Sequence, residues 1–333
     1  MIRRILAITG TALVVLALFT FLAYKLTPWP TAMLIRYYFN KEGLKVNDAL
    51  LKHVPAGVSS LLDQSYIEGD KDARLDVYCP EAIANTDQRL PVVVWVHGGG
   101  WISGSKAQVA NYCKILASKG YTVVAIDYSL APEKHYPLPL QQTNRALEYI
   151  NENAGRFHVD TNHFILAGDS GGAHIAAQTA NIISSAGYAD LIGVKPGINR
   201  KQLTGLILYC GAYDAGQIDL NGSSGIFLKT VLWSYSGEKD FVNAPLFKPA
   251  SVINYITKDY PACFISVGNG DPLLSHSLAL AKKLTELKVP LDSLFFKSDH
   301  KPVLPHEYQF NLDEAAGKLA LDRSVKFLER VSR

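Results

Sequence analysis

Short apolar runs alternate with segments of helical spacing over most of this chain. The apolar runs lie at residues 90–97, 121–128, 163–168, 203–210 and 261–268. Helical spacing is found at residues 106–120, 139–154 and 172–187. Runs with hardly a polar residue are typical of strands buried on both faces. Their alternation with helices predicts a mostly parallel sheet covered by helices on both sides.

The composition is that of a large globular domain. Hydrophobic residues make up 48% of the 333 residues and charged residues 19%, which is enough for a sizeable core in one α/β domain. The net charge is +3 and no dense basic run lies outside the N-terminus, so we expect no nucleic-acid partner. The four cysteines show no C-x-x-C spacing, which predicts no metal site. We expect them to be buried as small hydrophobes, and a disulfide stays open for an oxidising compartment.

The N-terminus differs from the rest of the chain. Residues 5–24 carry no charge, and about 20 such residues cross a bilayer of ~30 Å. We therefore expect a membrane anchor over residues 1–25, with a cleaved signal peptide as the alternative. The folded domain would then span residues 26–333. Basic residues flank both sides of the apolar run, and we expect the domain on the non-cytoplasmic side of the membrane.

The stretch "GDSGGAH" (168–174) places Ser170 in a G-x-S-x-G pattern. A buried strand is predicted before it and a helix after it, the setting of a nucleophile elbow. Gly168 and Gly172 would be small because strand and helix pass close to the turn. The alternative is a Ser/Gly turn that merely opens a helix.

A second glycine-rich stretch, "HGGGW" (97–101), follows another buried strand. Glycines let backbone N–H groups approach a developing oxyanion. A flexible loop or a phosphate cradle is the alternative, but the G-x-x-x-x-G-K-[ST] pattern of a phosphate loop is absent. We expect His97 to order this loop through hydrogen bonds.

A nucleophilic serine needs a base, and the base needs a carboxylate. Asp271 follows the strand at 261–268, where the alternative is an Asp-Pro turn. Two histidines, His300 and His306, follow the last predicted strand, and the spacing alone leaves both open as the base. His174 lies one helical turn after Ser170, and we expect a packing role for it.

Five stretches together resemble the hormone-sensitive-lipase-like branch of the α/β-hydrolase superfamily. They are "HGGGWISGS" (97–105), "DYSLAPEKHYPLP" (127–139), "GDSGGAH" (168–174), "GNGDPLL" (268–274) and "HEYQF" (306–310). The resemblance implies the α/β-hydrolase fold and a catalytic triad of Ser170, Asp271 and His306. It also implies that the backbones of Gly99, Gly100 and Gly171 supply the oxyanion donors. It implies no cofactor and no metal.

This chain departs from the family pattern at two positions. Gly171 stands where many relatives have alanine, a change that keeps the backbone N–H. The stretch "DPLLSHS" lacks a second acidic residue that many relatives carry after the Asp-Pro. Asp271 is therefore the only carboxylate in that stretch.

Two segments break the strand–helix rhythm, and we expect them to form a cap over the site. Residues 26–60 contain two predicted short amphipathic helices, and residues 212–258 form a long aromatic insertion. The insertion's aromatics indicate an apolar pocket, with plain packing as the alternative: Phe227, Trp233 and Tyr235. The expected function is a serine hydrolase of lipophilic carboxylic esters acting through an acyl-enzyme. A ligand-binding protein on a hydrolase scaffold and an amidase or peptidase stay as alternatives.

Overall fold

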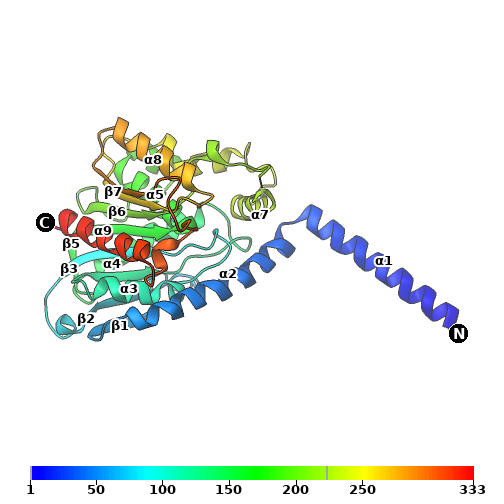
Figure 1. Cartoon of the computed structure of the whole chain (residues 1–333), viewed down its shortest axis with the longest axis horizontal. Coiled ribbons are helices and arrows are strands. Elements are labelled where there is room, and N and C mark those ends of the chain that lie inside the picture. The colour runs from blue at the N-terminus through cyan, green and yellow to red at the C-terminus, as the bar shows by residue number, and fades with distance from the viewer. Residues whose placement is uncertain (1, 223) are drawn as a thin grey trace.

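The computed structural model describes residues 2–222 and 224–333 and is built around one eight-stranded sheet (Figure 1). The strand order is β1-β2-β4-β3-β5-β6-β7-β8. β2 pairs antiparallel with β1 and β4, and every other neighbouring pair is parallel. The strands are β1 (Val58–Ser65), β2 (Arg74–Pro80), β3 (Leu90–Val96), β4 (Thr122–Ile126), β5 (Val159–Asp169), β6 (Leu203–Tyr209), β7 (Ala262–Val267) and β8 (Leu291–Phe295). The predicted mostly parallel sheet is confirmed.

Helices cover both faces of this sheet (Figure 1). α3 and α9 pack in one apolar core, and α4, α5 and α8 pack in the other. The central strand β3 is completely buried from Val92 to Val96, which explains its unbroken apolar run. The helices are α1 (Ile2–Leu26), α2 (Trp29–Leu50), α3 (Ala110–Ala117), α4 (Leu138–Glu152), α5 (Ser170–Ser184), α6 (Ala186–Ile192), α7 (Gly225–Ser236), α8 (Leu274–Glu286) and α9 (Ala315–Val331).

The prediction for residues 26–60 was wrong in its secondary structure. The two short helices are one helix of 22 residues, α2, which has proline in its first turn. The edge strand β1 begins at Val58, and its middle residues are exposed. An edge strand of this kind has no alternation of apolar and polar residues, and so the sequence pattern did not reveal it.

The predicted membrane anchor over residues 1–25 is not confirmed. These residues form most of α1, which projects away from the domain in Figure 1. Searched over its described residues, the structure has no helix with the length and apolar character that a membrane span requires. Met1 and several α1 side chains within the predicted anchor lie outside the described residues.

Candidate active site

Ser170 lies at the sharp turn between β5 and α5. Its φ of 49° is in the left-handed region, which is strained for a residue with a side chain. The chain is packed so closely at this turn that a Cβ on Gly172 would come within 2.1 Å of the Val96 carbonyl oxygen. A Cβ on Gly168 would come within 2.7 Å of the Gly172 backbone. The two glycines therefore have the steric role that the motif predicts.

Ser170, His306 and Asp271 form a continuous chain of hydrogen bonds. His306 Nε2 lies 3.0 Å from the Ser170 hydroxyl oxygen, and His306 Nδ1 lies 2.8 Å from Asp271 Oδ2. The Asp271 side chain is fully buried, and its other oxygen accepts the Leu273 N–H at 2.7 Å. The carboxylate is thus held from two sides, so it can fix the orientation of the imidazole.

The surroundings of His306 favour a positive charge on its ring. Burial works to lower the pKa of His306, but Cys210, Asp271 and Glu307 outweigh it, and the pKa is raised above its ordinary value. Burial raises the pKa of the Cys210 thiol to about 11, so the thiol is uncharged near pH 7. Cys210, Asp271 and Glu307 together favour the imidazolium over the neutral ring. That cation is the state His306 would reach on taking a proton from Ser170.

The glycine loop at 97–101 lies directly beside the residue that follows Ser170. A Cβ on Gly171 would lie 3.4 Å from the backbone nitrogen of Gly100. Gly99 has a φ of 109°, and a Cβ there would come within 2.3 Å of the Ser103 carbonyl oxygen. Gly100 also has a positive φ, of 60°. The structure thus brings together the backbones of the three expected oxyanion donors, Gly99, Gly100 and Gly171.

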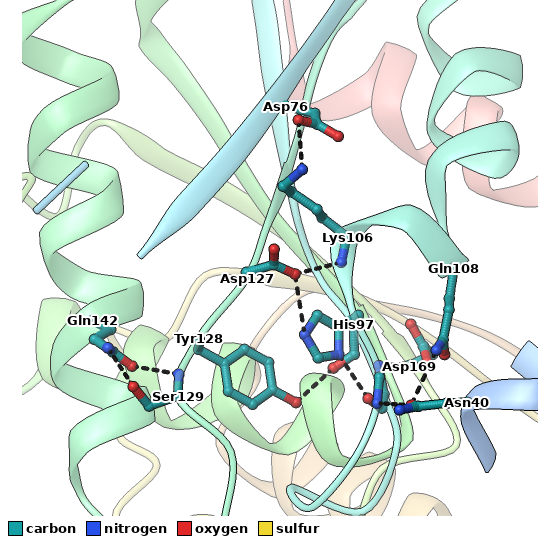
Figure 2. A network of polar contacts seen from close by, with 12 residues as sticks. Asn40, Asp76, His97, Lys106, Gln108, Asp127, Tyr128, Ser129, Gln142 and Asp169 are labelled. Atoms are coloured by element: carbon teal, nitrogen blue, oxygen red, sulfur yellow. Dashed lines mark hydrogen bonds and ion pairs between the residues drawn. The ribbon is translucent and has the colours of Figure 1, made fainter. Parts of the chain in front are cut away.

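His97 supports the glycine loop from behind (Figure 2). Burial lowers its pKa to about 4, so the ring is neutral, and Nδ1–H donates to the Gly98 carbonyl at 2.8 Å. The ring stacks on Tyr128 with centroids 4.3 Å apart, and the Tyr128 hydroxyl donates to the His97 carbonyl. These contacts hold His97 and the glycine loop in place, which is the role expected for this histidine.

An ion cluster around the buried Lys106 and Asp76 lies near this loop, and Figure 2 shows these two residues with Asp127. The Lys106 ammonium lies 2.9 Å from Asp76 and 2.7 Å from Asp63. Its backbone N–H donates to Asp127 at 2.6 Å. Burial works to lower the pKa of Lys106, but these carboxylates raise it. The cluster joins Lys106, five residues after the glycine loop, to Asp63 of β1, Asp76 of β2 and Asp127 just after β4. The sequence reasoning did not predict it.

A second pair missed by the sequence reasoning is Asp169 and Glu307. Asp169 is buried and accepts hydrogen bonds from Trp95 Nε1 and the Gly98 N–H, both at 2.8 Å. Burial and the adjacent, hydrogen-bonded Glu307 raise the pKa of Asp169 well above its ordinary value. Glu307 Oε1 lies 3.7 Å from His306 Nε2. A sequence signal for this pair was available: Asp169 directly precedes Ser170, and Glu307 directly follows His306.

A cavity of about 590 Å³ opens beside the triad. One side is formed by α2 and α7, where Phe39 and Phe227 pack with ring centroids 5.5 Å apart. Among the three predicted cap aromatics, Phe227 lines this cavity. Tyr235 is buried and stacks on Trp101, and Trp233 lies on the side of α7 that faces α1. α2 and α7 contribute six apolar side chains to the cavity lining: Phe39, Val46, Phe227, Leu228, Val231 and Leu232.

Two other histidines, His300 and His174, have partners other than Ser170. His300 packs against Phe296, with ring centroids 4.6 Å apart. His174 is buried, and its Nε2–H donates to the Ala250 carbonyl at 2.8 Å, in line with its expected packing role.

One of the four cysteines, Cys210, lies beside the triad residues Asp271 and His306. All four cysteines are buried and unpaired. Cys210, Asp271 and His306 bring their ligand atoms within 4.8 Å of one another. In this structure Asp271 and His306 contact each other, with His306 Nδ1 2.8 Å from Asp271 Oδ2.

The fold and this arrangement define the class of protein, an α/β-hydrolase. Among solved structures, an inhibited esterase B from Lactobacillus rhamnosis superposes with a TM-score of 0.75 and 23% identity, covering 90% of this chain and 96% of that one. An esterase from Pyrobaculum calidifontis superposes with a TM-score of 0.72 and 21% identity, covering 95% and 97%.

The family follows from the sequence comparisons. The BD-FAE family model matches residues 75–284, and the chain belongs to this family, within the hormone-sensitive-lipase-like α/β-hydrolases. An acetyl esterase of Salmonella schwarzengrund is 27% identical over 67% of this chain and 66% of its own length. A mimivirus protein described as an alpha/beta hydrolase is 28% identical over 70% and 68%. The chain is accordingly a hydrolase of the esterase class.

Proposed function

We propose that the protein is a serine hydrolase of carboxylic esters that works through an acyl-enzyme. The proposal rests mainly on the continuous contacts from Asp271 through His306 to Ser170. Ser170 lines the same cavity as Gly99, Gly100 and Gly171. Relatives named acetyl esterase and neighbours named esterase support an ester as the substrate.

In the proposed reaction the Ser170 oxygen attacks the ester carbonyl carbon, and its proton moves to His306 Nε2. The carbonyl oxygen takes up negative charge, which the backbone N–H groups of Gly99, Gly100 and Gly171 would stabilise. His306 then gives the proton to the leaving alcohol as its C–O bond breaks, and the acyl group stays on Ser170. A water molecule repeats both steps, which releases the carboxylic acid and restores the serine hydroxyl.

The proposed substrates are lipophilic esters. The α2 and α7 side of the cavity is apolar, and its volume of about 590 Å³ lies within the range of small-ligand sites, about 300–1,000 Å³. With p-nitrophenyl esters of rising acyl length, we expect kcat/KM to rise beyond the acetyl ester before it falls. A strict preference for charged, water-soluble esters would contradict the proposal.

The nucleophile is tested by covalent labelling with a fluorophosphonate probe. We expect the full chain to be labelled at Ser170 and the Ser170→Ala variant to remain unlabelled, with ester hydrolysis reduced by about 10⁴-fold or more. An unlabelled, inactive wild type would favour the binding-protein alternative. Matched ester and amide substrates separate an esterase from an amidase, and we expect at least 100-fold faster ester cleavage.

A further inference from the structure

His276 is a buried polar residue in the cavity wall for which the proposed mechanism has no use. It lies near the start of α8, is 3% exposed and lines the same cavity as Ser170. Its position falls in the stretch "DPLLSHS", where this chain departs from the pattern of its relatives. Polar lining on this side of the cavity also comes from Gln217 and Asp219.

The hydrogen-bonding state of the His276 ring is fixed by its neighbours. The backbone N–H of Asp214 donates to His276 Nδ1 at 3.2 Å, so this nitrogen is an acceptor and carries no hydrogen. Burial lowers the pKa of His276 to about 4, and the ring is neutral near pH 7. A neutral imidazole carries one hydrogen, which must therefore sit on Nε2.

The Asp214 N–H is itself held firmly in place. The Asp214 side chain accepts the Gly216 N–H at 2.9 Å, and the next N–H, of Ala215, donates to the Ser251 hydroxyl at 3.1 Å. The turn cannot rotate away without losing these bonds. The ring of His276 is thus kept in one orientation and one tautomer before any substrate arrives.

The Nε2–H group has no hydrogen-bond partner within the part of the chain that the structure describes. The His276 Nε2 atom is not fully sealed from solvent, so the nitrogen retains some accessible surface. A ligand that covers this donor without offering an acceptor would leave the N–H unpaired, which costs free energy. A substrate oxygen at this point would remove that cost.

We propose that His276 Nε2–H donates a hydrogen bond to a second oxygen of the substrate, in addition to the reacting ester group. The inference rests on the proposed function and narrows its substrate class. The cavity then takes lipophilic esters that carry an ether, hydroxyl or carbonyl oxygen in the acyl or alcohol part. Sites built to bind a substrate oxygen discriminate against analogues that lack it, because the protein donor is left unpaired.

The test compares esters that differ by one oxygen in place of a methylene. In the acyl part the pair is p-nitrophenyl methoxyacetate and p-nitrophenyl butyrate; in the alcohol part it is 2-ethoxyethyl acetate and pentyl acetate. The measured quantity is the ratio of kcat/KM for the ether ester to that for the alkyl ester. Comparison of this ratio between protein variants cancels the intrinsic reactivity of the esters.

We expect the ratio for one pair to fall about five-fold in His276→Phe, as befits the loss of one neutral hydrogen bond. His276→Gln keeps a side-chain donor and should retain at least half of the wild-type ratio. His300→Phe is the matched control, since this histidine lies outside the cavity, and its ratios should equal those of the wild type. If His276→Phe does not fold, His276→Met replaces it as an unbranched apolar side chain.

Failure of the inference can be told apart from failure of the proposed function. If the wild type is labelled at Ser170 and hydrolyses p-nitrophenyl butyrate, but both ratios stay within two-fold in the His276 variants, the assigned hydrogen bond is wrong and the esterase stands. If His276→Gln loses the ratio as fully as His276→Phe, the ring acts by shape and the inference is overturned. A wild type without labelling or hydrolysis overturns the proposed function.

Discussion

The glycine loop and the cap helix α7 form two walls of one cavity, but they are held by different forces. The loop is fixed by polar contacts: the Gly98 N–H donates to the buried Asp169, and just after the loop the Gly104 N–H donates to Asn40 of α2. On its cavity side α7 packs through apolar contacts, such as the Phe39–Phe227 pair, and its polar contacts to His135 and Tyr136 are confined to its C-terminal end. A hydrogen bond requires a defined distance and angle between donor and acceptor, whereas apolar burial has no directional requirement. We therefore expect changes around the loop to reduce turnover or stability strongly, and changes in α7 to alter substrate preference mildly.

Among changes in these two walls, the largest expected effect comes from Gly99→Ala. Its Cβ would meet the Ser103 carbonyl at 2.3 Å, and its φ of 109° excludes a side chain. The backbone at this expected oxyanion donor must then move, and we expect kcat to fall about 100-fold or more. Steady-state hydrolysis of p-nitrophenyl butyrate measures the loss.

Gly100→Ala is the matched control for that loss. A Cβ there has room, with its nearest neighbour 3.5 Å away, although the φ of 60° carries a cost of about 1–2 kcal/mol. We expect a smaller reduction of kcat than in Gly99→Ala. Equal losses in the two variants would mean that backbone space is not what makes the loop rigid.

The next effect concerns stability and comes from Lys106→Met. The change removes the ammonium beside Asp76, which is 4% exposed, and leaves that carboxylate without its cation. Breaking a buried ion pair in this way lowers the free energy of unfolding by about 3–5 kcal/mol. Urea denaturation gives the value.

Lys45→Met serves as the control because the Lys45–Glu42 pair is exposed on α2. Exposed pairs of this kind contribute about 0.2–0.5 kcal/mol. If the two variants lose similar stability, the cluster behind the glycine loop contributes no more than a surface pair, and its contrast with the apolar cap disappears.

The sequence predicted the parts of the molecule whose signals are local. Ser170 and the two flanking glycines follow from a strand, a turn and a helix that are adjacent in the chain, and the sheet follows from its apolar runs. The cluster of Lys106 with Asp63 and Asp76 joins residues that lie far apart in sequence, so no spacing reveals it. The stretch "DPLLSHS" marked a departure from the family pattern, but it did not single out His276, whose hydrogen bond comes from Asp214, 62 residues away.

A smaller effect is expected for Glu307→Gln, which should shift the pH dependence of kcat/KM. Glu307 faces His306 and contributes to the raised pKa of its ring, beside Asp271 and the uncharged Cys210. Removing this charge lowers the pKa of His306. The base must be neutral, so activity is lost as the pH falls through that pKa, and the acid limb of kcat/KM moves to lower pH.

The pH profile of kcat/KM from pH 4 to 9 measures this shift, and Glu286→Gln at the exposed end of α8 should leave the profile unchanged. An acid limb that stays in place in Glu307→Gln would show that the charge on Glu307 does not reach His306.

The smallest expected effect is that of Phe227→Ala in the apolar wall. The change removes one half-buried ring from the cavity and from its contact with Phe39, and no buried polar group loses a partner. We expect kcat/KM for long acyl esters to change by about two- to ten-fold relative to the acetyl ester, since apolar pocket contacts contribute ~1–3 kcal/mol at most. Trp233→Ala, on the outer side of α7, should leave this ratio unchanged. A 100-fold loss on every ester in Phe227→Ala would mean that α7, like the glycine loop, positions reacting groups. The distinction between the two walls would then be wrong.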